Sequence, residues 1–245
     1  MKSKDIKIFF DSHSHYSAYN KNPDYYIPVV KSLSHFANKE FNVLDVGCGD
    51  GSFLKGLRNS GVKGRFIGID ISYNLLKKAK DDLRIEDNIN LIVTDGFNIP
   101  INDALKFDLI HLDSVLHHLI SDTRYKSLKL SKDLLRMLKS KLSKNGILLV
   151  EEMYYNSRVI PFITSSFIFY SLKLINASNI DFSILRNDIK PGLEVSFFYE
   201  DQLKKILNQF GPVEIISRIP SKISNLEKSL LLKERGHISY LVKTT

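Results

Sequence analysis

Three glycines at alternate positions follow a short apolar run and precede a helical pattern. They lie in the segment Asp45-Val46-Gly47-Cys48-Gly49-Asp50-Gly51. Glycine allows positive φ and a close approach of the backbone to a ligand, and a helix start offers free N–H groups. The G-x-G-x-G spacing differs from the G-x-G-x-x-G of dinucleotide sites, and Asp45 would repel a pyrophosphate. The segment therefore favours a nucleoside that carries an amino acid, because a carboxylate attracts its ammonium group.

Acidic residues end the two apolar runs that follow this loop. Asp70 lies ~20 residues past the loop, which is the distance that a βαβ unit requires. Asp95 stands in a Thr-Asp-Gly turn, and a later apolar run leads into Asp113 and the pair His117 and His118. Open α/β sheets bind ligands at the carboxyl ends of their strands. We therefore expect these side chains near the glycine loop.

These motifs, in this order, resemble those of the class I S-adenosylmethionine-dependent methyltransferases. Within this family the sequence is similar to the small-molecule enzymes of ubiquinone and menaquinone biosynthesis. The Leu-His-His at 116–118 is part of this resemblance. The resemblance covers about residues 40–155 well and the last strands loosely. One departure is Lys144-Asn145-Gly146, which stands where the family more often has Lys-Pro-Gly-Gly.

The resemblance implies that S-adenosylmethionine binds here and leaves as S-adenosylhomocysteine. Asp70 is similar to the residue that holds the ribose hydroxyls, and Asp95 to the one at the adenine amino group. Residues 11–19 resemble an N-terminal segment that closes over the cofactor. The implied cofactor residues are Asp45, Gly47, Cys48, Gly49, Gly51, Asp70, Ile71, Asp95, Gly96, Asp113, Tyr16 and Tyr19.

Ordinary structural roles remain open for several of these residues. Asp45 is also a suitable turn residue at a strand end, and Asp70 could cap the following helix. Asp95 beside a glycine is common turn chemistry. Cys48 is interpreted as a small, space-filling residue whose backbone matters, and not as a nucleophile.

Methyl transfer from a sulfonium is an in-line displacement, so the protein mainly positions the nucleophile and excludes water. A general base is needed only for a poor nucleophile such as a phenol, a hydroxyl or a protonated amine. The candidate catalytic residues are His118, Glu151 and His117, at the ends of two predicted strands. The alternative is that their hydrogen bonds only fix the loops.

Strand and helix patterns alternate through the middle of the chain. Strands are expected at 42–47, 65–70, 89–94, 107–112 and 147–151, with helices at 52–60, 73–83 and 122–142. After a helix at 201–210, strands at 213–219 and 237–243 lack a crossover helix between them. The pattern predicts an α/β, Rossmann-like, seven-stranded, mostly parallel sheet with helices on both faces. The strand order of the family that the sequence resembles is 3-2-1-4-5-7-6, with strand seven antiparallel. This order agrees with the two adjacent strands expected at 213–219 and 237–243.

Two segments lie outside this alternation within what we expect to be a single domain, 1–245. Residues 1–40 are predicted to form an N-terminal helical cap, with an amphipathic helix at about 25–37. Residues 154–194 are rich in Phe, Ile and Ser and far exceed an ordinary connection, which predicts an inserted helical lid. An apolar lid suits an apolar or aromatic acceptor. A homodimer interface and shallow contact with a membrane surface are the alternatives.

Bulk composition sets further limits. The net charge is +8, but Lys and Arg are spread along all 245 residues, so a solvated basic surface competes with a functional basic patch. A single cysteine excludes an intrachain disulfide. The N-terminus lacks an apolar signal segment, and no stretch reaches the ~20 apolar residues of a spanning helix. We expect a soluble cytoplasmic protein without a transmembrane segment.

The function predicted from the sequence is methyl transfer to an O, N or C nucleophile of an apolar or aromatic small molecule. One alternative is an RNA or protein methyltransferase that uses the basic surface, although the Asn/Asp-Pro-Pro-Tyr signature of many such enzymes is missing. Another is a non-catalytic homologue that only binds the cofactor. Asp11, His13 and His15 alternate, but their spacing matches no zinc pattern, so no metal is expected.

Overall fold

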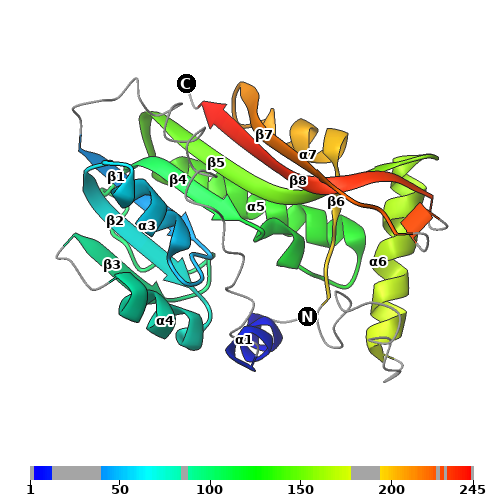
Figure 1. Ribbon diagram of the computed structural model, residues 1–245, viewed down its shortest axis with the longest axis horizontal. Coiled ribbons are helices and arrows are strands. Elements are labelled where there is room, and N and C mark those ends of the chain that lie inside the picture. Colours follow the sequence, from blue (N-terminus) through cyan, green and yellow to red (C-terminus); the bar gives the residue numbers. More distant parts are fainter. Residues whose placement is uncertain are drawn as a thin grey trace.

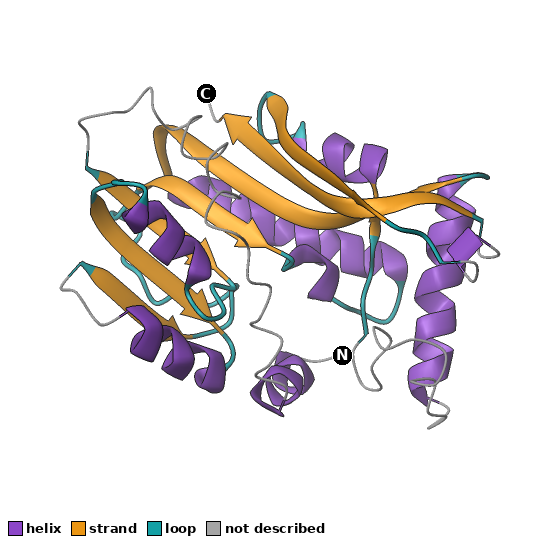
Figure 2. Ribbon diagram, in the orientation of Figure 1, coloured by secondary structure: helices purple, strands orange, loops and turns teal. Residues whose placement is uncertain are grey.

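A computed structural model shows a single twisted sheet with helices on both faces (Figure 1; Figure 2). The strand order is β3-β2-β1-β4-β5-β8-β7, and a short strand, β6, pairs with β5. This is the predicted order 3-2-1-4-5-7-6 with one unpredicted strand added. The structure describes residues 3–12, 40–83, 88–177, 194–224, 227–228 and 231–243.

The described strands form parallel pairs except at β8, which runs antiparallel to both of its neighbours. The parallel arrangement requires a helical crossover after most strands, as the alternating sequence pattern predicts. The strands are β1 (Phe41–Val46), β2 (Gly64–Asp70), β3 (Ile89–Val93), β4 (Phe107–Asp113), β5 (Leu142–Ser157), β6 (Phe198–Tyr199), β7 (Val213–Ser221) and β8 (Leu232–Lys243).

Two helical layers bury the two faces of the sheet. In β1, Leu44 and Val46 pack in a cluster with α5 and α7, whereas Val43 packs with α3 and α4, as the two-residue period of a strand requires. The helices are α1 (Ser3–Ser12), α3 (Ser52–Asn59), α4 (Tyr73–Leu83), the 3₁₀ turn η4 (Leu116–His118), α5 (Arg124–Lys141), α6 (Pro161–Ala177) and α7 (Glu200–Leu207).

Strand β5 is much longer than the predicted strand 147–151. It begins directly after α5 and pairs with β8 as far as Ser157. Asn145, with a φ of 65°, therefore lies inside this strand, whereas the expected strand 147–151 began only after it. Residues 154–157 belong to the sheet, so the helical part of the predicted insert begins later, at α6.

The N-terminal cap is only partly described. Helix α1 was not predicted from the sequence, and the helix expected at 25–37 lies outside the described residues. Figure 1 shows α1 beside the carboxyl ends of the parallel strands, and α6 where β5 ends and β8 begins. None of the helices in the described part of the chain is long and apolar enough to cross a membrane.

Candidate active site

The glycine loop joins β1 to α3 at the carboxyl edge of the sheet. Gly47 and Gly51 have φ of 74° and 76°, left-handed values that disfavour other residues. The N–H groups of Gly47 and Cys48 both donate to the carbonyl oxygen of Ile69, which ties the loop to β2. A Cβ at Gly49 would meet no described atom within 4 Å. The loop is therefore fixed at its base and leaves open space at its middle.

Asp70 ends β2 and connects the loop to the next helix. Its Oδ2 accepts the Gly49 N–H at 2.9 Å, and its Oδ1 accepts the Ser72 N–H at 2.8 Å. Burial raises the pKa of Asp70 to about 6, against the lowering effect of these two hydrogen bonds. Ser72 caps α4 through the Leu75 N–H, so the predicted helix start is confirmed. Asp70 and the adjacent Ile71 therefore lie beside the loop, and their role as cofactor residues stays a prediction.

Helix α1 packs against this edge. Ser72 donates through Oγ to Asp11 Oδ1 at 2.7 Å, and Asn74 donates through Nδ2 to the Asp11 carbonyl oxygen at 2.8 Å. The Phe10 ring packs edge-on against His118, with 5.3 Å between ring centroids. Helix α1 therefore spans from the end of β2 to the segment after β4. The predicted cofactor residues Tyr16 and Tyr19 lie outside the described residues.

Three further predicted cofactor residues lie at or just after strand ends at this edge. Asp95 and Gly96 come soon after β3, and Asp95 Oδ1 accepts the Phe97 N–H at 2.9 Å. Asp113 ends β4 and accepts the Ser114 hydroxyl at 3.0 Å. Ser114 itself has a φ of 57°, and such strain in a residue other than glycine gathers at functional sites.

Asp45 and Glu151 share a buried histidine that sequence reasoning missed. His111 Nδ1 lies 2.7 Å from Asp45 Oδ1, and its Nε2 lies 3.0 Å from Glu151 Oε1. Burial lowers the pKa of His111, but the two carboxylates outweigh it and raise the pKa to about 9. The Phe53 ring stacks on the imidazole at 3.6 Å. At neutral pH this cation offsets part of the negative charge beneath the loop.

The carboxylate of Glu151 is turned into the sheet. Besides His111, it accepts the Ser239 hydroxyl through Oε2 at 3.1 Å, and its side chain is 2% exposed. This geometry favours the alternative that Glu151 fixes its neighbours. Both carboxylate oxygens of Glu151 thus have partners inside the sheet.

The predicted histidine pair lies in η4, against the end of β5. His117 donates through Nδ1 to the fully buried Glu152, and its backbone N–H donates to the same carboxylate at 3.3 Å. The His118 ring lies 4.0 Å from the His117 ring. Burial, and then His117, lower the pKa of His118 well below its usual value, so its imidazole is neutral at pH 7. Sequence reasoning found this pair but missed Glu152 as its partner.

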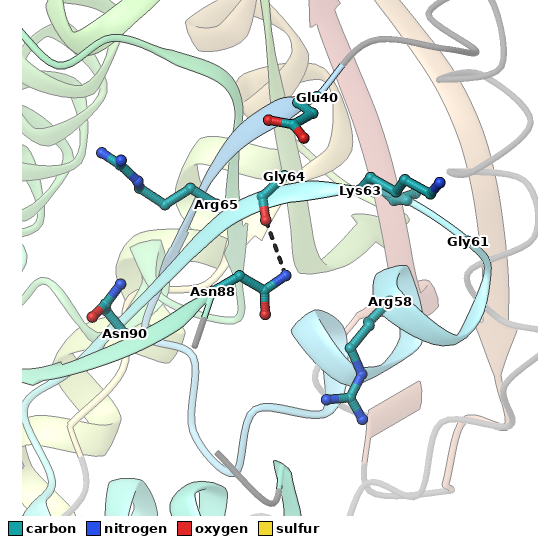
Figure 3. A pocket seen from close by; sticks show the side chains of 9 residues that line it. Glu40, Arg58, Gly61, Lys63, Gly64, Arg65, Asn88 and Asn90 are labelled. Atoms are coloured by element: carbon teal, nitrogen blue, oxygen red, sulfur yellow. Dashed lines mark hydrogen bonds between the residues drawn. The ribbon is translucent and has the colours of Figure 1, made fainter. Parts of the chain in front are cut away.

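A polar hollow of about 600 Å³ lies at the opposite edge of the sheet (Figure 3). Its basic side chains are Arg58, Lys63 and Arg65, and Asn88 there donates to the Gly64 carbonyl oxygen. It adjoins the starts of β1 and β2, whereas the glycine loop and the histidine pair follow strand ends. None of the predicted site residues lines it.

The polar groups around the glycine loop fit S-adenosylmethionine, the cofactor that the motifs imply. The Asp70 carboxylate accepts the Gly49 N–H beside the open space at the middle of the loop and suits ribose hydroxyls. Asp45 of β1, held by His111, adds a second negative charge that suits an ammonium group. Burial, and then the nearby carboxylates, raise the pKa of Cys48 well above its usual value, so it remains a thiol. Among the described residues, no group of three or more His, Cys, Asp and Glu side chains could hold a metal ion.

Comparison with known families decides the class. Residues 37–211, well over half of the chain, match the family described as "Methyltransferase domain". The chain belongs to the S-adenosylmethionine-dependent methyltransferases. A malonyl-[acyl-carrier protein] O-methyltransferase of Ilyobacter polytropus is 33% identical to this methyltransferase over 97 residues, 37% of this chain and 35% of the relative. The chain thus spans only about a third of that curated relative.

Solved structures share the fold at low sequence identity. YcgJ of Bacillus subtilis has a TM-score of 0.59 at 14% identity, covering 89% of this chain and 98% of its own. Magnesium protoporphyrin IX methyltransferase of Synechocystis PCC 6803, solved with S-adenosylhomocysteine, has a TM-score of 0.58 at 16% identity, covering 98% and 99%. These structures confirm the predicted fold, and the predicted cofactor, S-adenosylmethionine, follows from the methyltransferase family to which the chain belongs.

Proposed function

We propose that this methyltransferase methylates an O, N or C nucleophile of an apolar or aromatic small molecule. The observation that carries the proposal is the neutral His118 beside His117, with an apolar ring packed on each histidine, at the edge that holds the glycine loop. Phe10 packs on His118, and the Phe197 ring lies 5.6 Å from His117. An acceptor beside these rings would be shielded from water.

The cofactor, when bound, supplies a sulfonium-activated methyl group. The protein's remaining task is to place the acceptor in line and, for a weak nucleophile, to accept its proton. His118 is suited to this because its Nδ1 is buried and finds no hydrogen-bond partner in the part of the chain that the structure describes. Glu152 holds His117, and the packing of the two rings positions His118 in turn.

Helix α6 supplies the apolar surface that the acceptor requires. Lys173 donates to the carbonyl oxygens of Ser121 and Asp122, just past the histidine pair, at 2.9 and 3.1 Å. These bonds hold α6 beside the loop that leaves the site. Four of its exposed apolar side chains recur every three or four residues, at Ile163, Phe167, Tyr170 and Leu174, and Phe162 is exposed at the start of the helix. We propose that this stripe is the acceptor-binding side of the lid.

Transfer of tritium from labelled S-adenosylmethionine tests the proposal. The enzyme is incubated with small-molecule, RNA and protein fractions of source cells. We expect label in the organic-extractable small molecules. The double variant Phe167→Ser/Leu174→Ser should lower this transfer at least tenfold and leave cofactor affinity unchanged, because apolar contact with the acceptor is lost.

The matched control is Ile219→Ser, which removes an exposed apolar side chain from β7. It should transfer as well as the wild type. Label in RNA or protein alone would contradict the small-molecule acceptor. Full activity of the α6 double variant would contradict the proposal that the apolar stripe of α6 binds the acceptor.

A basic surface for RNA has less support. The hollow described above gathers the basic side chains of Arg58, Lys63 and Arg65, and it lies at the edge of the sheet away from the histidine pair. An RNA bound there would not bring its bases to the cofactor. The small-molecule acceptor is therefore the function that the geometry supports best.

A further inference from the structure

Arg124 is a buried cation that has no anionic partner among the described residues. It opens α5, and only 4% of its surface is exposed. Its Nη2 donates to Gln202 Oε1 at 2.7 Å, while its Nε is buried and donates to no group within the described ranges. Guanidinium groups that leave water are normally paired with an anion, because desolvating an unpaired charge is costly.

The neighbours of Arg124 do not supply that anion. The titratable groups that act on its pKa are Tyr155, Tyr199 and Tyr170, from β5, β6 and α6, and none of them is a carboxylate. Burial lowers the pKa of Arg124, yet a guanidinium stays charged in proteins. The Tyr155 hydroxyl is already hydrogen-bonded to Ser165. The described surroundings of Arg124 are therefore polar but uncharged.

The position of Arg124 relates it to the acceptor side of the site. It follows His118 by six residues, and the Ser121 N–H donates to Ser127 Oγ at 2.9 Å, which holds the intervening loop against α5. Lys173 fastens α6 to the same loop. Arg124 thus lies beneath the proposed lid, and the histidine pair stands at the other end of the short loop.

We propose that Arg124 binds a carboxylate at one end of the acceptor. The inference rests on the proposed function and narrows it: the acceptor is an apolar molecule with an acidic group. A guanidinium presents a planar fork of donors that matches a carboxylate, and Nε is the donor still available to it. This carboxylate anchors the acceptor, and the methylated atom lies elsewhere on the molecule, towards His118.

Calorimetric titration of the enzyme saturated with S-adenosylhomocysteine tests the anchor. Octanoate and benzoate serve as acidic probes, and octanamide and benzamide as uncharged probes of the same shape. The wild type should bind each acid at least tenfold more tightly than its amide. Arg124→Gln should remove this preference by weakening the acids and leaving the amides unchanged. Arg124→Lys, which keeps the charge but not the fork, should be intermediate.

Arg136→Gln is the matched control, because Arg136 lies on the same helix but is exposed and paired with Asp133. It should bind acids and amides as the wild type does. Equal affinity of the wild type for acid and amide would overturn the proposal, and so would an unchanged acid preference in Arg124→Gln. If Arg124→Gln does not fold, the wild type and Arg124→Lys decide the question. Failure of S-adenosylhomocysteine itself to bind would instead count against the proposed function.

Discussion

Replacing Asp70 with asparagine is expected to weaken S-adenosylmethionine binding at least tenfold. The carboxylate already organises the loop by accepting the Gly49 and Ser72 N–H groups, and ribose hydroxyls need an acceptor at the same place. Asparagine keeps the size but turns one acceptor into a donor, which leaves polar groups unpaired. Calorimetry at pH 7.5 measures the change, with the exposed Asp133→Asn as the control for loss of a carboxylate elsewhere.

The raised pKa of Asp70 adds a dependence on pH. Because this pKa is about 6, the ionised carboxylate that accepts from ribose is lost as the pH falls through 6. Wild-type affinity should be constant above pH 7 and weaken about tenfold for each pH unit below 6, as expected for one linked proton. The Asp70→Asn profile should be flat over this range. Equal affinity of the variant and the wild type would remove Asp70 from the cofactor site.

Replacing His118 with asparagine is expected to lower kcat about 100-fold or more, with the acceptor that the tritium transfer identifies. Removal of a positioned general base typically costs 10²–10⁴ in rate. Cofactor affinity should change less than twofold, since His118 lies after β4 and not in the glycine loop. Rapid-quench measurement of single turnovers separates the transfer step from product release.

The lowered pKa of His118 predicts the shape of the pH profile. The imidazole is already neutral at pH 6.5, so kcat should show no inflection from this group between pH 6.5 and 8. A kcat for His118→Asn within threefold of the wild type would show that the histidine only packs against Phe10. Loss of cofactor binding together with kcat would show that it supports the loop.

The first four strands could be predicted because each has a recognisable pattern in its own local sequence. Each is a short apolar run that ends in a glycine turn or an acidic residue, and burial on both faces gives parallel strands this continuous apolar character. Strand β5 could not be bounded in this way. Its last residues, Tyr154 to Ser157, are polar or aromatic, and they pair with β8, which lies far away in the sequence. These residues form a strand because they pair with β8, and the local sequence pattern carries no information about that pairing.

The candidate site was predicted for residues at strand ends and missed for residues inside elements. His111 lies within the apolar run of β4, where its role depends on Asp45 and Glu151 from two other strands. Arg124 is one of many basic residues, and what sets it apart is a buried Nε that has no hydrogen-bond partner in the described part of the chain. Both features depend on contacts across the fold. The order of the motifs did locate the edge of the sheet at which these residues meet.

A crystal structure of the chain with S-adenosylhomocysteine tests the central claim most directly. The account predicts electron density across the glycine loop, with the ribose hydroxyls within hydrogen-bond distance of Asp70 and the sulfur facing His118. Density in the basic hollow of Arg58, Lys63 and Arg65 would contradict it, and so would an empty glycine loop at saturating ligand.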